Sequence, residues 1–239
     1  MYIHFTELDI PVSAAISERK HGNMRMSAQD PWAVGRRAPF MNTAFEDWKR
    51  EATVRLVHGN QIEVVGEATR ERVEFINRDG LITNVPGTVL TVNAADCPTL
   101  FLYDPIKKVV GIAHCGWKGL HAGIVSHILR TMRRAYDTNP SDILAAIGPG
   151  IGPCHFEVGP EVAELFGWLT NVKTFLNLPI IITKQLKKLG VLGGNIVSDN
   201  AECTYCAMDG DQPKYFSYRR DKSDPLETMM SGIMLRPGE

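Results

Sequence analysis

The chain has 239 residues, of which 44% are hydrophobic and 22% charged, and its formal net charge is −1. This composition is typical of a folded globular protein that is long enough to bury ~70–75% of its unfolded surface. No basic run exceeds two residues and no apolar run approaches ~18–20 residues, which argues against a nucleic-acid-binding protein, a membrane-surface protein and a membrane span.

The cysteine content favours a reducing compartment. An odd number of cysteines in a long chain makes a disulfide framework a poor explanation. The first residues also lack the basic and apolar regions of a secretory signal, so we expect a cytoplasmic protein. The cysteines are Cys97, Cys115, Cys154, Cys203 and Cys206.

The first hundred residues predict mostly strands. Alternating apolar residues and turn signals mark these strands, and residues 24–42 and 66–78 are expected to be irregular or exposed. A turn at residues 59–60 is expected to join the second and third strands as a hairpin. The pattern predicts strands over 10–16 (at a sheet edge), 53–58, 62–65, 81–83 and 88–93, and a helix over 43–51.

The second half combines a hairpin with helices. Two short apolar runs flank a five-residue turn at 104–108, which predicts paired strands over 99–103 and 109–113. Further strands are predicted over 143–147, 191–197, 214–218 and 233–235, and helices over 120–136, 160–166 and 180–189. The whole chain, residues 1–239, therefore reads as one α+β domain of mixed strands with flanking helices.

The hairpin brings two metal-binding residue types to one end of a sheet. Cys97 precedes its first strand and His114 follows its second, and antiparallel pairing places these two positions side by side. His58 ends another predicted strand. One Cys and two His leave a zinc ion with an open fourth position, as in catalytic sites. The alternative is a buried thiol and two ordinary hydrogen-bonded histidines.

Other patterns are weaker. Cys203 and Cys206 form a Cys-x-x-Cys pair, which can be redox active or supply half of a zinc site. Because no second such pair exists, two loop thiols that are dispensable for the chemistry are the simpler interpretation. The glycine-rich loop 148–153 lacks the Lys-Ser/Thr of a P-loop, and we expect rigid backbone that positions Cys154 and Glu157 near a pocket.

Two segments could contact an anion. Residues 116–119 start a predicted helix, where free N–H groups favour negative charge, although an ordinary strand-to-helix turn is equally consistent. Arg219 and Arg220 follow a short apolar run, and at most one of two adjacent strand residues faces a given pocket. A solvated sheet edge is the simpler interpretation of that pair.

Taken together, these residues resemble a known family. The chain resembles, over about residues 10–235, the proteins named variously laccase-domain proteins, multicopper polyphenol oxidases, purine nucleoside phosphorylases and peptidoglycan editing factors. The motifs that carry the resemblance are VHGN at 57–60, AADCPTLF at 94–101, AHCGWKG at 113–119, IGPGIG at 147–152, CHFEVG at 154–159 and FSYRRD at 216–221.

The resemblance implies a fold, a metal site and a reaction. It implies an α+β sandwich whose zinc ligands are His58, Cys97 and His114. It also implies phosphorolysis of purine nucleosides and deamination of adenosine in one pocket, with a nucleoside and phosphate as the small-molecule partners. The chain departs from the family pattern at Leu56, Cys115 and Lys118, which leaves the preferred nucleoside open.

The resemblance also suggests residues that bind substrate. Arg19 matches an arginine of the family, and together with Lys118 in the 116–119 turn it is a candidate to bind phosphate. Asp79 and Asp96 are candidates to orient a metal ligand or the substrate, because a zinc-bound imidazole usually donates its other N–H to a carboxylate or carbonyl.

Three alternatives remain open. Copper binds nitrogen and sulfur ligands tightly and could occupy the same site, but none of the seven histidines forms the His-x-His pairs of a multicopper oxidase. Cys97 and His114 could instead be the nucleophile and base of a zinc-free amidase that edits a peptidoglycan precursor. A protein without enzymatic activity would turn over none of these substrates.

Overall fold

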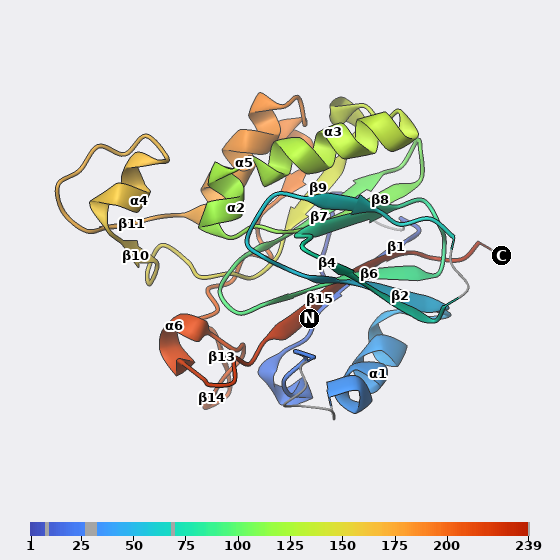
Figure 1. Cartoon of the computed structure of the whole chain (residues 1–239), viewed down its shortest axis with the longest axis horizontal. Coiled ribbons are helices and arrows are strands. Elements are labelled where there is room, and N and C mark those ends of the chain that lie inside the picture. The colour runs from blue at the N-terminus through green and yellow to red at the C-terminus, as the bar shows by residue number, and fades with distance from the viewer. Residues whose placement is uncertain (8–9, 27–32, 68–69, 239) are drawn as a thin grey trace.

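Two β-sheets packed face to face form the centre of the molecule, and helices cover both outer faces (Figure 1). The structure, a computed structural model, describes residues 1–7, 10–26, 33–67 and 70–238. The helices are α1 (Ala33–Ala44), α2 (Trp117–His121), α3 (Ile124–Tyr136), α4 (Pro160–Glu164), α5 (Leu178–Lys188) and α6 (Tyr218–Asp221).

The six-stranded sheet contains the predicted hairpin at its centre. Strands β7 and β8 are antiparallel, and Thr99 pairs with His114 at the end of the hairpin. The strands, in spatial order, are β12 (Ile196–Val197), β9 (Leu144–Ile147), β7 (Thr99–Asp104), β8 (Val109–His114), β5 (Gly80–Thr83) and β3 (Ile62–Val64).

The five-stranded sheet lies against it. Its first strand lies at the sheet edge, as predicted, and pairs with the last strand of the chain. The strands, in spatial order, are β1 (Val12–Ile16), β15 (Met229–Leu235), β6 (Thr88–Ala94), β2 (Arg50–Arg55) and β4 (Arg72–Ile76). Two short hairpins complete the strands: β10 (Glu157–Val158) with β11 (Thr174–Phe175), and β13 (Met208–Asp209) with β14 (Gln212–Pro213).

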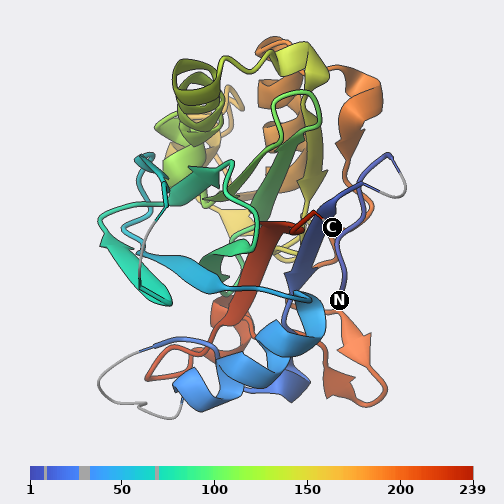
Figure 2. The same ribbon diagram turned by 90° about the vertical axis from the view of Figure 1, so that its right-hand side faces the viewer.

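Figure 2 shows the strands stacked between α3 and α5 on one side and α1 on the other. Three apolar layers hold these sheets and helices together. One lies between α3, α5 and the six-stranded sheet, and includes Ile128 and Ile182. The second fills the space between the two sheets, and includes Phe101 and Leu90. The third, which includes Phe45, packs α1 on the outer face of the five-stranded sheet. The predicted α+β class and the implied sandwich are therefore confirmed.

A buried arginine fastens α1 to its sheet. The Arg37 guanidinium forms an ion pair with Glu51 of β2 and donates hydrogen bonds to Thr91 Oγ1 at 3.2 Å and Met24 O at 2.8 Å. A buried charge costs several kcal/mol unless it is paired and hydrogen-bonded, so these partners fix where α1 sits on the sheet.

The first hundred residues depart from the sequence prediction in three ways. Residues 33–42 lie in α1 and not in an irregular segment, because Phe40 and Met41 bury themselves against the sheet despite a proline within the helix. The rest of the segment predicted as irregular, residues 27–32, lies outside the described residues. The predicted helix 43–51 is wrong, since α1 ends at Ala44 and Asp47 adopts a left-handed φ of 56° before β2 begins.

The third departure concerns strands. Residues 72–76 of the expected exposed segment form β4, which pairs in parallel with β2 at the edge of its sheet. The hairpin predicted between β2 and β3 is wrong, because the two strands belong to different sheets. The segment between them, which carries His58, therefore crosses from one sheet to the other.

In the second half of the chain, the structure departs from the sequence prediction at turns. The predicted helix 120–136 is two helices, because Gly123 takes a left-handed φ of 83° between α2 and α3. Only residues 196–197 of the predicted strand 191–197 are strand. The strand predicted over 214–218 is wrong, since Ser217 caps α6 by accepting a hydrogen bond from Arg220 N. The remaining predicted elements agree with the structure, with shifts of up to four residues at their ends. The strand predicted over 53–58 is β2, which ends at Arg55, so His58 follows the strand and does not end it.

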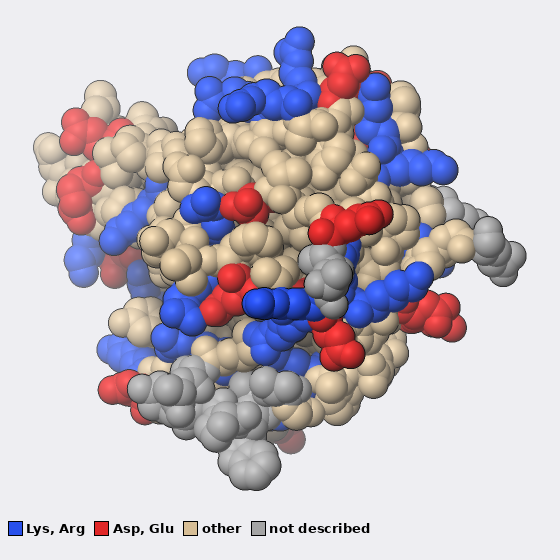
Figure 3. Space-filling model, turned by 45° about the vertical axis from the view of Figure 1, so that its right-hand side comes forward, with Lys and Arg blue, Asp and Glu red and all other residues tan. Residues whose placement is uncertain are grey.

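Charges of both signs are interspersed on the face that Figure 3 shows. No helix in the described part of the chain is long and apolar enough to cross a membrane.

A substitution at Gly232 tests the packing of α1 on β15. A Cβ at this position would lie 2.6 Å from Phe45 Cζ, so Gly232→Ala should lower the free energy of unfolding by about 1–3 kcal/mol. Gly35→Ala, at an exposed helical position with open space around it, should instead raise it by about 0.5–1 kcal/mol. Urea unfolding measures both, and equal effects of the two variants would contradict this packing.

Candidate metal centre

The β7–β8 hairpin and the crossing segment after β2 bring three potential metal ligands together. Cys97 lies two residues before Thr99, whose partner across the hairpin is His114. His58 follows β2 and adopts a left-handed φ of 58°, which is uncommon for a residue with a side chain. The ligand atoms of His58, Cys97 and His114 all lie within 4.8 Å of one another, and their residues form one of the groups that could hold a metal ion.

The space around these side chains fits a small ion. The rings of His58 and His114 lie edge to face, with centroids 4.9 Å apart. A Cβ on Gly116 would lie 2.9 Å from Cys97 Sγ, 3.5 Å from His114 Cε1 and 3.6 Å from His58 Cδ2. Glycine at position 116 thus leaves a small gap beside all three ligands, and a Cys-His-His donor set in that position matches the ligands that zinc accepts.

A buried carboxylate connects the two histidine ligands. Asp79, which is fully buried, accepts hydrogen bonds from Gly59 N at 2.9 Å and Val57 N at 3.3 Å on either side of His58. Its Oδ1 also lies 3.7 Å from Nδ1 of His114. The carboxylate therefore faces this nitrogen at a distance slightly longer than a hydrogen bond, and the other ring nitrogen would be left for a metal.

The charges at the site favour ionised ligands. Burial by itself would raise the pKa of the Cys97 thiol, but His114 and His58 beside it outweigh burial and lower the pKa to about 6. Burial would likewise lower the pKa of His114, but the Cys97 thiolate and Asp79 raise it to about 9. Without a metal, the pair is therefore a thiolate and an imidazolium; a metal would replace the imidazolium proton.

The three side chains line a cavity of about 540 Å³. Val54 and Arg55 at the end of β2 and Asn93 at the end of β6 form the wall on one sheet, and His114 ends β8 on the other. The cavity therefore lies where strands of both sheets end. Its other walls include Arg25, Met26, Leu226 and Thr228.

The predicted substrate residues fall in different places. Asp79 is at the site, as described. Asp96 neighbours Cys97 but accepts hydrogen bonds from Thr204 Oγ1 and Arg219 N, both at 2.7 Å, so its carboxylate braces the backbone beside the ligand. Arg19 lies outside the cavity lining and forms an ion pair with Asp221 at 2.9 Å.

The turn at 116–119 does begin a helix, as expected, and its anion binding stays a prediction. The helix it begins, α2, has only five residues, so little helix dipole accumulates there. Lys118 lies with its ammonium 5.5 Å from the centroid of the Trp117 ring and outside the cavity lining. Sequence reasoning instead missed Arg25 and Arg55, which do line the cavity. Their only sequence signal is charge, which many surface residues share.

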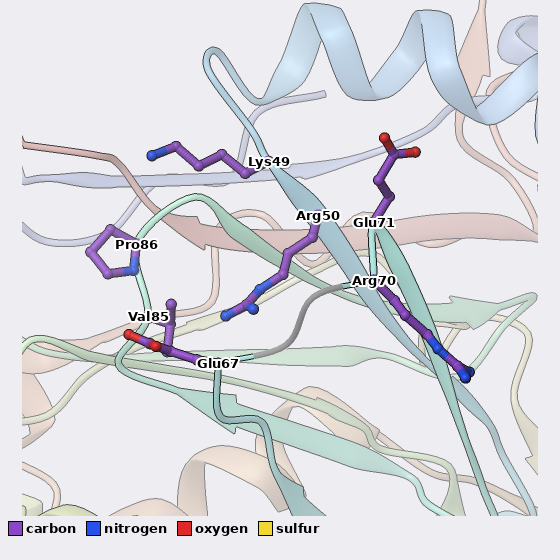
Figure 4. Close-up of a pocket in the computed structure, with 7 residues that line it drawn as sticks. All are labelled: Lys49, Arg50, Glu67, Arg70, Glu71, Val85 and Pro86. Carbon is purple, nitrogen blue, oxygen red and sulfur yellow. The ribbon is translucent and has the colours of Figure 1, made fainter.

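Two other features of the sequence and structure lie apart from this site. The charged pocket in Figure 4 lies where β2, β4 and β6 begin, around Val85 and Pro86. Its Lys49, Arg70 and Glu71 side chains point in different directions. The glycine-rich loop 148–153 does hold Cys154 near partners, but these are the Cys-x-x-Cys thiols and not His58 or Cys97. Cys203 and Cys206 lie between strands, as expected, but the sequence did not indicate that Cys154 and His155 lie beside them.

The fold and the site define an α+β sandwich with a Cys–His centre that could bind a metal at the end of both sheets. Residues 12–236 match the family described as multi-copper polyphenol oxidoreductase laccase. The chain belongs to this family, which confirms the resemblance.

Relatives are similar in sequence over about 70% of this chain. The chain is 35% identical over 175 residues to the human "Purine nucleoside phosphorylase LACC1", a match that covers 69% of this chain and 39% of that protein. It is 32% identical over 177 residues to "Purine nucleoside phosphorylase YfiH" of Escherichia coli, covering 70% and 67% of the two chains. Thus the chain spans about two fifths of the human relative's length.

Two solved structures have the same fold as this chain. The crystal structure of the hypothetical protein YfiH from Bacillus licheniformis superposes with a TM-score of 0.84 at 27% identity, over 97% of this chain and 99% of that one. YlmD from Geobacillus stearothermophilus gives a TM-score of 0.81 at 26% identity, covering 95% and 93%.

Asp79→Asn tests whether the buried carboxylate supports the centre. Loss of its charge should weaken zinc binding by about 10–100-fold, because such partners of a ligating imidazole typically contribute that much. Competition with a chelator measures the affinity. Asp104→Asn is a matched control, since Asp104 is also buried and accepts two backbone N–H groups, Ile106 N and Lys107 N, at the opposite end of the hairpin. Equal zinc affinities of the two variants would contradict the role of Asp79.

Proposed function

We propose that this protein is a zinc-dependent purine nucleoside phosphorylase that also deaminates adenosine. The observation that carries the proposal is the convergence of His58, Cys97 and His114 on the wall of a cavity. The names of its relatives supply the substrate class, a purine nucleoside and phosphate. Inosine and methylthioadenosine are further candidate substrates.

The donor set favours zinc. Three protein ligands of the Cys-His-His type leave one coordination position free, and a zinc ion bound there supplies a Lewis acid that activates an oxygen nucleophile. His58, Cys97 and His114 would hold the ion, and Asp79 would keep His114 oriented. Copper can bind the same nitrogen and sulfur donors, in keeping with the family's description.

The cavity suits a nucleoside in size and lining. Its volume of about 540 Å³ lies within the range of about 300–1,000 Å³ that small-molecule sites occupy. Met26, Val54 and Leu226 give it apolar surface against which a purine can pack, while Thr228 adds a polar group. The ligand triad then lies beside the bound molecule and not beneath a closed protein layer, because His58 is exposed.

Arg25 is the best candidate to bind phosphate. It lines the metal-site cavity and also the adjoining pocket, whose other charged residues are Arg219, Lys222 and Asp224, so positive charge predominates there. Arg55 also lines the cavity but donates a hydrogen bond to Glu74 at 2.6 Å. Arg25 therefore replaces Arg19 and Lys118 in this proposal.

A Cys–His amidase is the second candidate. The lowered pKa of Cys97 favours it, since a thiolate beside an imidazolium is the arrangement of a nucleophilic cysteine. A polyphenol oxidase is less well supported. The two His/Cys groups found among the described residues contain three histidines in all, fewer than a multicopper centre uses.

The remaining properties follow from the same interpretation. We propose that residues 1–239 act as one laccase-like domain on small molecules, without nucleic-acid or membrane partners. We also place the protein in the cytoplasm. The odd number of cysteines in a long chain supports that location.

Turnover of adenosine tests the function. With phosphate, zinc-loaded protein should release a free base and ribose-1-phosphate, and should form some inosine and ammonia. Omitting phosphate should stop base release and spare ammonia release, because only the first reaction uses phosphate as the nucleophile. Chelation should abolish deamination, because the oxygen nucleophile depends on the metal.

Cys97→Ala separates the two candidate functions. For a phosphorylase, the variant should lose zinc together with activity, since Cys97 is a ligand. For an amidase, it should lose hydrolysis of a peptidoglycan precursor while metal content stays unchanged. Hydrolysis of that precursor by metal-free wild-type protein, with no turnover of nucleosides, would replace the phosphorylase proposal.

Arg25→Ala tests the phosphate contact. Loss of one charged contact should raise KM for phosphate by about 10-fold or more and leave deamination unchanged. Arg19→Ala is the control, because Arg19 lies outside the cavity and pairs with Asp221. A larger phosphate effect in the control than in Arg25→Ala would restore Arg19 as the phosphate ligand.

A further inference from the structure

Four metal-binding side chains converge at a second place in the fold. Cys154 and His155 come from the loop after β9, and Cys203 and Cys206 come from the segment between β12 and β13. One ligand atom from each of the four lies within 4.8 Å of the others. None of these residues belongs to the cavity centre.

The distances fit one tetrahedral ion. Cys154 Sγ lies 3.8 Å from Cys206 Sγ, and His155 Nδ1 lies 3.1 Å from Cys154 Sγ and 3.7 Å from Cys203 Sγ. With zinc–sulfur bonds of about 2.3 Å and zinc–nitrogen bonds of about 2.0 Å, a tetrahedron separates two sulfurs by about 3.8 Å and sulfur from nitrogen by about 3.5 Å. The four side chains therefore need only small shifts to surround an ion.

The neighbouring groups support the ligands. Gly152 N donates to Cys203 Sγ at 3.2 Å, an N–H contact of the kind that stabilises a metal-bound thiolate. A Cβ on Gly152 would lie 3.1 Å from Cys203 Cβ and 3.3 Å from Cys154 Sγ, so glycine allows the two segments to approach closely. The Tyr205 ring stacks on His155, with centroids 4.0 Å apart, and fixes the plane of that imidazole.

We propose that Cys154, His155, Cys203 and Cys206 bind a structural zinc ion. Three thiolates and one imidazole form a closed Cys₃His set with no open position, which is the composition of structural zinc sites and not of catalytic ones. This site does not depend on the proposed enzymatic function, and its test reads metal content without a nucleoside.

The ion would join two loops that support the cavity centre. Gly150 and Cys203 form an isolated β-bridge, and Thr204 N donates to Gly150 O at 3.0 Å. Both loops also donate hydrogen bonds to Asp96: Ile151 N donates to its backbone oxygen at 2.6 Å, and Thr204 Oγ1 donates to its carboxylate. Cys97 follows Asp96 directly, so a clamp on these loops positions the backbone that carries a ligand of the first centre.

Elemental analysis of the full chain, purified under reducing and anaerobic conditions, tests the proposal. Wild-type protein should contain two zinc ions per chain. Cys206→Ser and Cys97→Ala should each contain one, and the double variant none. With cobalt in place of zinc, the ion lost in Cys206→Ser should account for about three quarters of the thiolate-to-cobalt absorption, since three of the four thiolates belong to this site.

Substitutions of His155 separate metal binding from packing. His155→Ala and His155→Cys both remove the ring that stacks on Tyr205, but only the cysteine can bind zinc. His155→Cys should therefore keep two zinc ions and His155→Ala should keep one, with a melting temperature lower by ~5 °C or more.

One zinc ion in the wild-type protein and none in Cys97→Ala would overturn the proposal. So would equal zinc contents of His155→Ala and His155→Cys. A disulfide between Cys154 and Cys206 that persists under reducing conditions would also overturn it, because that bond would consume two of the four ligands.

Discussion

The buried carboxylate of Asp79 holds the cavity centre together. It lies directly before β5, in the six-stranded sheet, yet it accepts N–H groups from the segment that follows β2 of the other sheet. Burial alone would raise its pKa, but the nearby His114 ring and the hydrogen bond from Gly59 N lower it, which favours the ionised form. A buried charge is stable only when it is paired, and here its partners are the segments that carry two metal ligands.

The architecture explains why the site forms at one end of the sandwich. β2 and β6 end beside β8, and each of these ends contributes to the cavity wall. The chain crosses between sheets at residues 56–61, which places His58 opposite the hairpin that supplies Cys97 and His114. The metal ligands thus come from both sheets, and apolar packing between the sheets keeps them at a fixed separation.

The sequence predicts the hairpin and its ligands because the information is local. Two apolar runs with a short turn determine the pairing of Thr99 with His114, and hence the position of Cys97. His58 is a candidate because it ends another predicted strand, and the family resemblance then implies that all three residues bind zinc. Helix α1 could not be predicted in this way, since its residues become helical through burial of Phe40 and Met41 and through the Arg37–Glu51 ion pair, all of which depend on a sheet formed elsewhere.

The sequence also does not predict contacts between loops that are distant along the chain. Cys203 and Cys206 have no second Cys-x-x-Cys pair, and their partners, Cys154 and His155, are adjacent residues some 50 positions away. The bridge between Gly150 and Cys203 and the hydrogen bonds beside it bring the segments together. Arg19 matched a motif but pairs with Asp221, because a match of residue type does not determine the direction in which a side chain points.

The central claim is that His58, Cys97 and His114 hold a metal ion. Anomalous diffraction above and below the zinc absorption edge, from crystals of the zinc-loaded protein, tests it most directly. The account predicts an anomalous peak about 2.0–2.3 Å from all three ligand atoms, with no protein atom at the fourth position. Absence of a peak there in crystals whose dissolved protein contains zinc would contradict the claim.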